Sequence, residues 1–315
     1  MTRYLLRRLG HALTVLLVVC TVTFGIIHVA PGGPAILADP KLSVAERRAL
    51  EERLGVDRPL VVQYGVWLGR VARGDLGQSF LYEAPNARTI AARLPNTALL
   101  AGTAILLSVA IAIPIGLWCA ARPFGWADRT LSGISFAVMA IPTFWLAIGL
   151  IFIFAVTLRV LPAGGAFTLG GAADPFDRAR HLVLPAIVLA AVTTAELFRY
   201  ARSSARTVLS QPFVRVARAK GAAERRVRWR HALRPALLPV LTVVGIQLPR
   251  LISGAAITET VFAWPGMGRL GVQAALGRDY PLIMAITLFV SAAVVLVNIL
   301  VDLAYLWLDP RVRLE

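Results

Sequence analysis

Six long apolar stretches constrain what this 315-residue chain can fold into more than any other feature. Each stretch has at least the roughly 20 residues that an α-helix needs to cross the hydrocarbon core of a membrane. Hydrophobic residues make up 57% of the chain and are grouped in blocks, which is too apolar for a soluble domain. The stretches lie near residues 9–30, 95–121, 130–158, 182–202, 236–262 and 281–308. We therefore predict an all-α, polytopic membrane protein with six transmembrane helices.

The basic residues predict the orientation of these helices, because short loops rich in Lys and Arg face the cytoplasm. The first apolar stretch is longer than the roughly 7 to 15 residues of a secretory signal's hydrophobic region, so we expect it to be retained as a span. The basic residues that share one side are Arg3, Arg7, Arg8, Arg122, Arg129, Arg311, Arg313 and those of the segment 203–235. Both termini and this segment are therefore predicted to be cytoplasmic.

This topology divides the chain into a first span at 1–30, an external segment at 31–94 and a five-span core at 95–315. In the external segment, Ser43 and Glu46 have the spacing of a capping box at the start of a helix. We expect a second helix after Pro59 with an apolar face that lies over the outer ends of the spans. A solvated loop with incidental helices is the alternative.

The most informative segment is the basic stretch between the fourth and fifth spans. Pro212 suits the first position of a short helix, and Gly221 suits the left-handed residue that ends one. A second helix is expected from Ala222 onward. Phe213 and Val216 alternate with arginines, so the first helix could enter a groove on another protein. A helix lying on the membrane surface is the alternative, and these patterns alone do not separate the two.

The sequence of this segment, VRVARAKGAAERRVRWRHALRPALLP, resembles the cytoplasmic loop of dipeptide/oligopeptide-type permeases of the ATP-binding-cassette importers. The resemblance continues along the chain in the order RYLLRRL, APGGPA, LGVDRPLVVQYGVWL, RGDLGQS, RLPNTALL, IPTFWLAIGL, ETVFAWPGMGRLG, DYPLI and LVDLAYLWLDPRVR. Gly221 occupies the glycine of the superfamily's Glu-Ala-Ala, three residues, Gly pattern. His231 and Arg234 depart from the end of that pattern, as is typical of the peptide-permease subclass.

The resemblance implies a type I importer permease fold in the inner membrane of a bacterial cell. It implies a non-catalytic subunit that forms half of a pathway for di- or oligopeptides by alternating access. The implied partners are a second permease subunit in a heterodimer, two cytoplasmic ATPase subunits and an extracytoplasmic solute-binding protein. ATP and Mg²⁺ would be bound by the ATPases, and no cofactor by this chain. The residues expected to couple to the ATPase are Arg215, Val216, Ala217, Arg218, Ala219, Lys220, Gly221, Ala222 and Glu224.

Similar permeases carry other solutes, so nickel chelates, glutathione-like compounds and sugars remain alternative substrates. An ion-coupled carrier is a weaker alternative, because the chain lacks the two similar halves of an inverted repeat. GMGRLG at 266–271 fits a dinucleotide pattern but follows a membrane helix instead of a strand, and the chain has no P-loop. The histidines and cysteines lack the spacing of a metal site. The net charge of +16 comes without a nucleic-acid-binding motif.

Three charged residues in the predicted spans are candidates for the pathway or for interior polar contacts: Arg250, Glu259 and Glu196. Arg250 lies near the middle of its span, where a guanidinium facing lipid costs at least about 2.5 to 3.5 kcal/mol. It should therefore face protein. Either Arg250 pairs with Glu196 or with an acid of a partner chain, or it lines the pathway and attracts an anionic group such as a peptide carboxylate.

Overall fold

The computed structural model describes residues 2–31, 33–38, 40, 42–168, 170 and 174–308. Helices account for the regular structure of these residues, and the β-structure among them is one isolated bridge between Gln78 and Pro85. The chain forms two compact units, the first from Met1–Asn96 and Gly266–Leu296, the second from Thr97–Pro265 and Val297–Arg313. The divisions predicted from the sequence are membrane spans and loops, whereas these units group the residues that contact one another in space.

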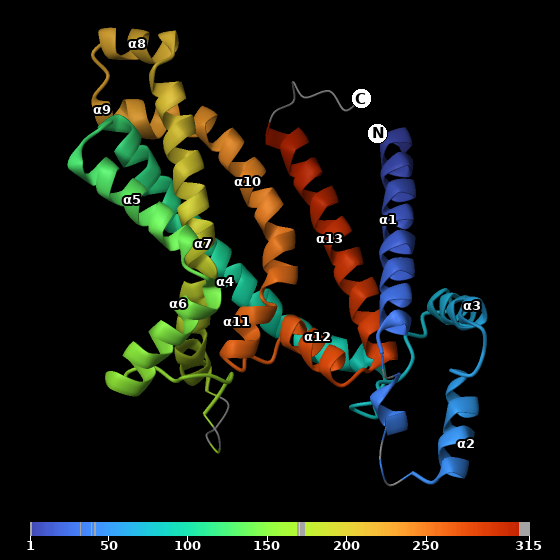
Figure 1. The fold of residues 1–315 in the computed structure, drawn as a ribbon. Helices are drawn as coiled ribbons and strands as arrows, with labels where there is room; N and C mark the ends of the chain where they lie inside the picture. The colour runs from blue at the N-terminus through green and yellow to red at the C-terminus, as the bar shows by residue number, and fades with distance from the viewer. Residues whose placement is uncertain are drawn as a thin grey trace. The chain divides into compact units, whose positions relative to one another are not determined.

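The first unit joins the N-terminal helix to the external segment (Figure 1). Its elements are α1 (Thr2–Val29), η1 (Ala35–Ala38), α2 (Val44–Leu54), α3 (Leu60–Val71), the start of α4 (Asn86–Ala121), α12 (Met267–Leu276) and the start of α13 (Tyr280–Leu308). The predicted capping box of α2 is confirmed, because Glu46 N donates to Ser43 Oγ at 3.2 Å and Ser43 N donates to the Glu46 carboxylate at 2.8 Å. Hydrogen bonding of the Glu46 carboxylate by the side chain and the backbone N–H of Ser43 lowers the pKa of Glu46.

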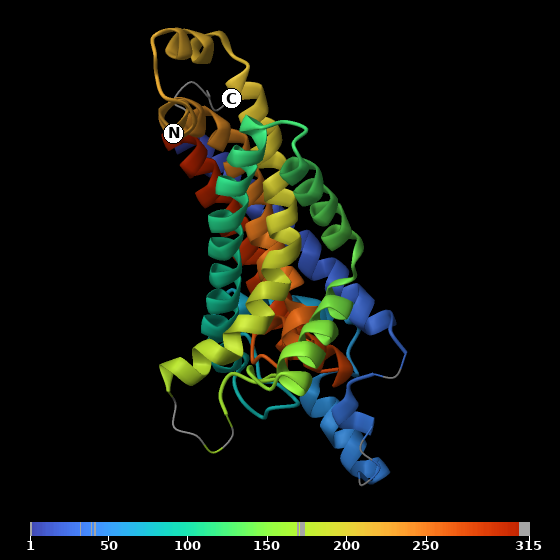
Figure 2. The same cartoon turned by 90° about the vertical axis from the view of Figure 1, so that its left-hand side faces the viewer.

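The second unit is built around α7, which α4, α5 and α10 surround (Figure 2). Buried residues of α7 such as Leu197 and Ala201 pack against Ala112 of α4 and Val240 of α10. The elements of this unit are the rest of α4, α5 (Trp126–Ala140), α6 (Thr143–Leu150), η2 (Ile151–Thr157), α7 (Pro175–Leu209), α8 (Pro212–Ala219), α9 (Glu224–Arg226), η3 (Val227–Ala232), α10 (Leu233–Gly254), α11 (Ala256–Val261) and the end of α13. Helix α7 therefore connects the other helices of the unit.

Four described helices are long and apolar enough to cross a membrane: Gly10–Val29, Asn86–Ala121, Pro175–Leu209 and Tyr280–Val301. The predicted span at 130–158 is instead two helical segments bent by 102°. Pro142 causes the break, because a residue before proline avoids the helical conformation, and Ile141 has φ −80° and ψ 124°. The predicted span at 236–262 is divided into α10 and α11, and its described apolar part is Pro235–Gln247.

Candidate functional site

The segment between α7 and α10 folds as the sequence predicts, into a short helix, a glycine turn and a second helical stretch. Helix α8 starts with Pro212 in its first turn and follows Gln211, which has extended backbone (φ −68°, ψ 151°). It lies beyond the C-terminal end of α7, opposite to the loop that precedes α7 (Figure 1). Proline suits this position because the first backbone N–H groups of a helix have no partner within it.

Gly221 ends α8 in a left-handed conformation with φ +80°. The backbone N–H of Gly221 donates to Arg218 O at 2.9 Å, and that of Ala222 donates to Ala217 O at 3.1 Å. This pair of bonds is the Schellman motif, which satisfies carbonyls that the helix end would otherwise leave open. A Cβ added at Gly221 would meet no atom within 4 Å, so the backbone conformation alone requires glycine here.

A bidentate ion pair crosses the glycine turn. Arg218 Nε donates to Glu224 Oε1 at 2.8 Å, and Arg218 Nη2 donates to Glu224 Oε2 at 3.3 Å. Both side chains are exposed, so the pair contributes modestly to stability. Its two parallel hydrogen bonds nevertheless fix the direction in which the chain leaves the turn.

One face of α8 is buried and the other is open. Val214 is fully buried on the face that packs toward η3, where Val227 is also buried. Phe213 and Val216 are 45% and 53% exposed, and exposed cationic side chains flank them. Apolar side chains surrounded by cations form a surface that can dock on a groove with an acidic rim. The predicted coupling residues Arg215, Val216, Ala217, Arg218, Ala219, Lys220, Gly221, Ala222 and Glu224 are thus brought together in one helix and its turn.

An ion pair that was not predicted from the sequence joins α5 to the end of α7, just before α8. Asp128, at the start of α5, accepts two hydrogen bonds from the guanidinium of Arg202 in α7 and a third, at 3.0 Å, from Phe124 N. Asp128 is 2% exposed, so removing Arg202 would leave a buried carboxylate without compensation. Asp128 lies in α5, well before α7 in the sequence. The residues around it do not indicate that Arg202 is its partner.

Two further contacts fasten the same end of α7. Arg206 lies over the ring of Phe124 with 4.6 Å from Cζ to the ring centroid, and Ser204 Oγ donates to Ala236 O of α10 at 2.9 Å. Together with the Asp128–Arg202 pair, these contacts tie α5, α7 and α10 to one another where α8 begins. A displacement of α8 would therefore be transmitted to three helices.

Two of the pathway candidates, Glu196 and Glu259, have different hydrogen-bond partners. Glu196 of α7 accepts a hydrogen bond from Gln247 Nε2 of α10, and it lines a cavity of about 610 Å³ between α5 and α7. Arg199 lines the same cavity, and its guanidinium lies 4.6 Å from the ring centroid of Phe136. Arg199 is not among the pathway residues predicted from the sequence, because it lies near the cytoplasmic end of the predicted span at 182–202, where a basic residue is typical.

Glu259 of α11 is fully buried and accepts a hydrogen bond from Thr97 Oγ1 of α4 at 2.7 Å. It is an interior polar residue in this conformation. Arg250 lies in α10, but its side chain falls outside the described residues, so its pairing with Glu196 stays a prediction.

Comparisons with known proteins give consistent matches over the whole length. Residues 112–314 match the family model described as "Binding-protein-dependent transport system inner membrane component". Residues 1–101 match the model described as "Binding-prot-dependent transport system membrane comp, N-term". Together the two models cover α1 and the external segment as well as the helices that carry α8.

Curated relatives match from end to end. The chain is 42% identical over 315 residues to the oligopeptide transport system permease protein AppB of Bacillus subtilis, covering 99% of this chain and 100% of the relative. It is 39% identical over 317 residues to a peptide permease protein of Brucella ovis, covering 99% of each. An inward-facing structure of the MetNI methionine ABC transporter is similar in fold, with a TM-score of 0.58 and 18% identity over 70% of this chain and 96% of that one.

Proposed function

The chain belongs to the family of binding-protein-dependent transport system inner membrane components, and from that premise we propose that it forms half of a peptide pathway in an ATP-driven importer. The observation that carries the proposal is the exposed apolar and cationic face of α8, held by the Schellman turn at Gly221. The names of the relatives point to peptides as the substrate class. A nickel chelate, a glutathione-like compound or a sugar would use the same machinery.

A permease subunit of this kind needs partner proteins for the other steps of transport. The chain carries no P-loop, so the ATPases that drive transport are separate subunits, and α8 offers them its exposed side chains Phe213 and Val216. A second permease chain supplies the other half of the pathway, and a solute-binding protein delivers the substrate outside. We place both termini and α8 in the cytoplasm, as the distribution of basic residues predicts.

The mechanism is alternating access driven by the partner ATPases. Closure of the ATPase dimer around ATP would displace α8 in each permease chain. Because the Asp128–Arg202 pair and the Ser204–Ala236 contact join α5, α7 and α10 next to α8, these helices would move as one body. The outward-open state is then favoured to the extent that ATP binds it more tightly than the inward-open state. Glu196 and Arg199, which line the cavity between α5 and α7, would meet the polar groups of the passing substrate.

The experiment that tests this function is purification of the chain with the products of its neighbouring genes, followed by reconstitution in vesicles. We expect an ATPase to copurify, and we expect the binding protein loaded with di- or oligopeptides to stimulate ATP hydrolysis and peptide uptake. Stimulation by a nickel chelate, glutathione or a sugar in place of peptides would correct the substrate. Uptake driven by an ion gradient without an ATPase would overturn the proposal.

A further inference from the structure

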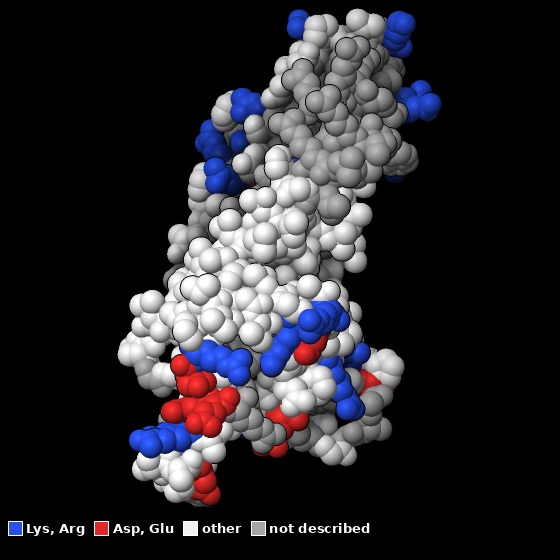
Figure 3. All heavy atoms as spheres, turned by 90° about the vertical axis from the view of Figure 1, so that its right-hand side faces the viewer, with Lys and Arg blue, Asp and Glu red and all other residues white. Residues whose placement is uncertain are grey.

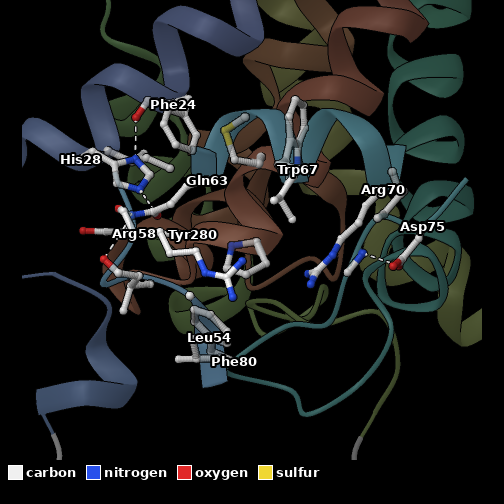
Figure 4. A pocket seen from close by; sticks show the side chains of 18 of the residues that line it. Phe24, His28, Leu54, Arg58, Gln63, Trp67, Arg70, Asp75, Phe80 and Tyr280 are labelled. Carbon is white, nitrogen blue, oxygen red and sulfur yellow. Dashed lines mark hydrogen bonds between the residues drawn. The ribbon is translucent and has the colours of Figure 1, made fainter. Parts of the chain in front are cut away.

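A cavity of about 190 Å³ lies within the first unit, outside all of the features used above. Helices α1 and α3, the loops on either side of α3 and the start of α13 line it (Figure 4). Its volume equals that of roughly six water molecules at about 30 Å³ each, which is enough for a polar headgroup but not for a long chain. The cavity is therefore suited to a small polar ligand.

Two guanidinium groups without a partner among the described residues line this cavity. The side chains of Arg58 and Arg70 extend into it from opposite sides, and neither guanidinium bonds to another residue of the described chain (Figure 4). A phosphate group would bind both of them, because guanidinium groups bind phosphate oxygens with charge-assisted hydrogen bonds.

Acidic side chains line the cavity as well. Glu52 and Asp75 contribute carboxylates, and one Asp75 oxygen already accepts a hydrogen bond from Gly77 N at 2.8 Å. The carboxylate of Glu52 has no hydrogen bond or ion pair among the described residues, so it is available to a cation. Two guanidinium groups and two carboxylates complement a ligand that carries both a phosphate and a primary ammonium group.

The position of the cavity along the helices places it at a membrane surface. The apolar span of α1 runs from Gly10 to Val29, and the cavity touches its last two turns at Phe24 and His28. The apolar span of α13 begins at Tyr280, which also lines the cavity. Since both spans reach water at this level, the cavity lies at the depth of lipid headgroups. Tyr64 and Trp67, stacked 5.7 Å apart, are the residue types enriched at this depth.

Apolar surface continues from the cavity onto α3. This helix has no buried residue, although it is apolar over most of its circumference. Val62 and Val66, one turn apart, are 44% and 41% exposed, and Val66 also lines the cavity. Figure 3 shows that charged side chains gather around the end that carries α2 and α3. A helix with a broad apolar face and a polar face that carries Gln63 and Arg70, at the level of the headgroups, is expected to lie in the membrane interface.

We propose that this cavity binds the headgroup of a phospholipid that carries both a phosphate and a primary ammonium group, as in phosphatidylethanolamine. Arg58 and Arg70 bind the phosphate, and Glu52 binds the ammonium group. The acyl chains lie along the exposed valines of α3. The lipid thereby anchors the segment after α1 to the membrane.

The experiment uses the complete transport complex, equilibrated in mixed micelles with equal parts of phosphatidylethanolamine, phosphatidylglycerol and phosphatidylcholine. Native mass spectrometry then measures which lipids stay bound. We expect the wild-type complex to retain phosphatidylethanolamine over phosphatidylcholine, whose trimethylammonium group cannot donate a hydrogen bond to Glu52. Arg58→Gln with Arg70→Gln should lower this retention about tenfold, because two charge-assisted hydrogen bonds are lost.

Further variants separate the contribution of Glu52 to lipid binding from that of the two arginines. Glu52→Gln should abolish the preference for phosphatidylethanolamine over phosphatidylcholine while lipid still binds. Arg58→Lys with Arg70→Lys should keep part of the retention. Arg47→Gln with Arg48→Gln is the matched control, because it removes the same charge from exposed positions of α2 outside the cavity. This control should bind lipid as the wild type does.

Two results would overturn the proposal. One is an identical lipid profile in the wild type and the double Arg→Gln variant. The other is unchanged lipid retention in that variant combined with weaker stimulation by the binding protein, which would assign the arginines to an acidic protein surface. Neither result contradicts the proposed transport function, since lipid retention is measured without transport and stimulation is compared with that of the wild-type complex.

Discussion

Two glycines of the second unit are required for opposite physical reasons. At Gly221 a Cβ would have open space, but φ of +80° disfavours any side chain. At Gly116 the helical backbone would accept any residue, but a Cβ would lie 2.8 Å from Ala201 Cβ and 3.0 Å from Arg202 N. The first glycine serves a turn, and the second serves the close approach of two helices.

Replacing Gly221 should therefore uncouple the permease from its ATPase without preventing membrane insertion. We expect Gly221→Val to strain the turn by about 1–3 kcal/mol, because a β-branched residue is poorly tolerated at positive φ. Uptake and peptide-stimulated ATP hydrolysis by the reconstituted complex should both fall. Gly221→Asn is the matched control and should keep most activity, since asparagine visits the left-handed region. Wild-type coupling in the valine variant would show that α8 does not dock through this turn.

At the residue scale, the sequence predicted the backbone roles better than the side-chain partners. Gly221 and Pro212 carry local conformational preferences, which are readable without a structure. The Asp128–Arg202 pair and the Glu196–Gln247 hydrogen bond join residues far apart in sequence. Such partners depend on how helices pack, and the hydrophobic pattern does not specify which polar side chains then meet.

Helix α4 crosses α7 at Gly116, and the closeness of this crossing determines how well the second unit packs. Small residues let helices in membranes approach until their backbones touch. Ala201 of α7 is fully buried at this contact, and Arg202 next to it holds Asp128 of α5. A larger residue at Gly116 would push α7 away from both α4 and α5.

We expect Gly116→Ala to lower the melting temperature of the purified complex. The clash is with backbone and Cβ atoms that cannot swing aside, so it should cost up to about 3 kcal/mol, more than the roughly 1 kcal/mol that alanine gains over glycine in a helix. Gly102→Ala on the same helix is the matched control, because its Cβ would meet no atom within 4 Å, and it should leave stability equal or raised. Equal melting temperatures for the two variants would contradict this account of the crossing.

At the element scale, the break between α5 and α6 has one property that the sequence predicts and one that it does not. Pro142 restricts Ile141 to extended backbone, so a helix boundary there is a local property. The bend of 102° is not local, because it depends on the packing of α6 against α7 and α11. An apolar run through 130–158 therefore predicted a span but not its broken form.

At the scale of the whole molecule, the fold class followed from the apolar runs, since only helices satisfy their backbone within a membrane without pairing to neighbours. The apolar runs alone do not give the number of membrane crossings, because a bent helix pair can either cross the membrane or turn back. Contacts within the second unit decide between these forms. Arg206, near the end of α7, lies over Phe124, just before α5. The loop before α5 and the end of α7 are therefore on the same side, which requires α5 and α6 to cross together.

Cysteine labelling tests this topology directly. Three crossings separate α2 from the turn after α8, so Ala45→Cys and Ala223→Cys should react with an impermeant maleimide from opposite sides of the membrane. Both positions are exposed, and neither is Ser43 or Glu224, whose side chains hold a cap and an ion pair. The background carries Cys20→Ala and Cys119→Ala, which remove two buried thiols.

A third position makes the result unambiguous. Ala163 is exposed in the loop between η2 and α7, so Ala163→Cys should react from the same side as Ala45→Cys. If α5 and α6 turned back instead of crossing, Ala163→Cys would react from the side opposite to Ala45→Cys, and Ala223→Cys would share the side of Ala45→Cys. The two topologies therefore predict reversed patterns at two positions. Labelling of Ala223→Cys from the cytoplasm, in inverted vesicles but not in intact cells, would in addition place α8 where an ATPase can reach it.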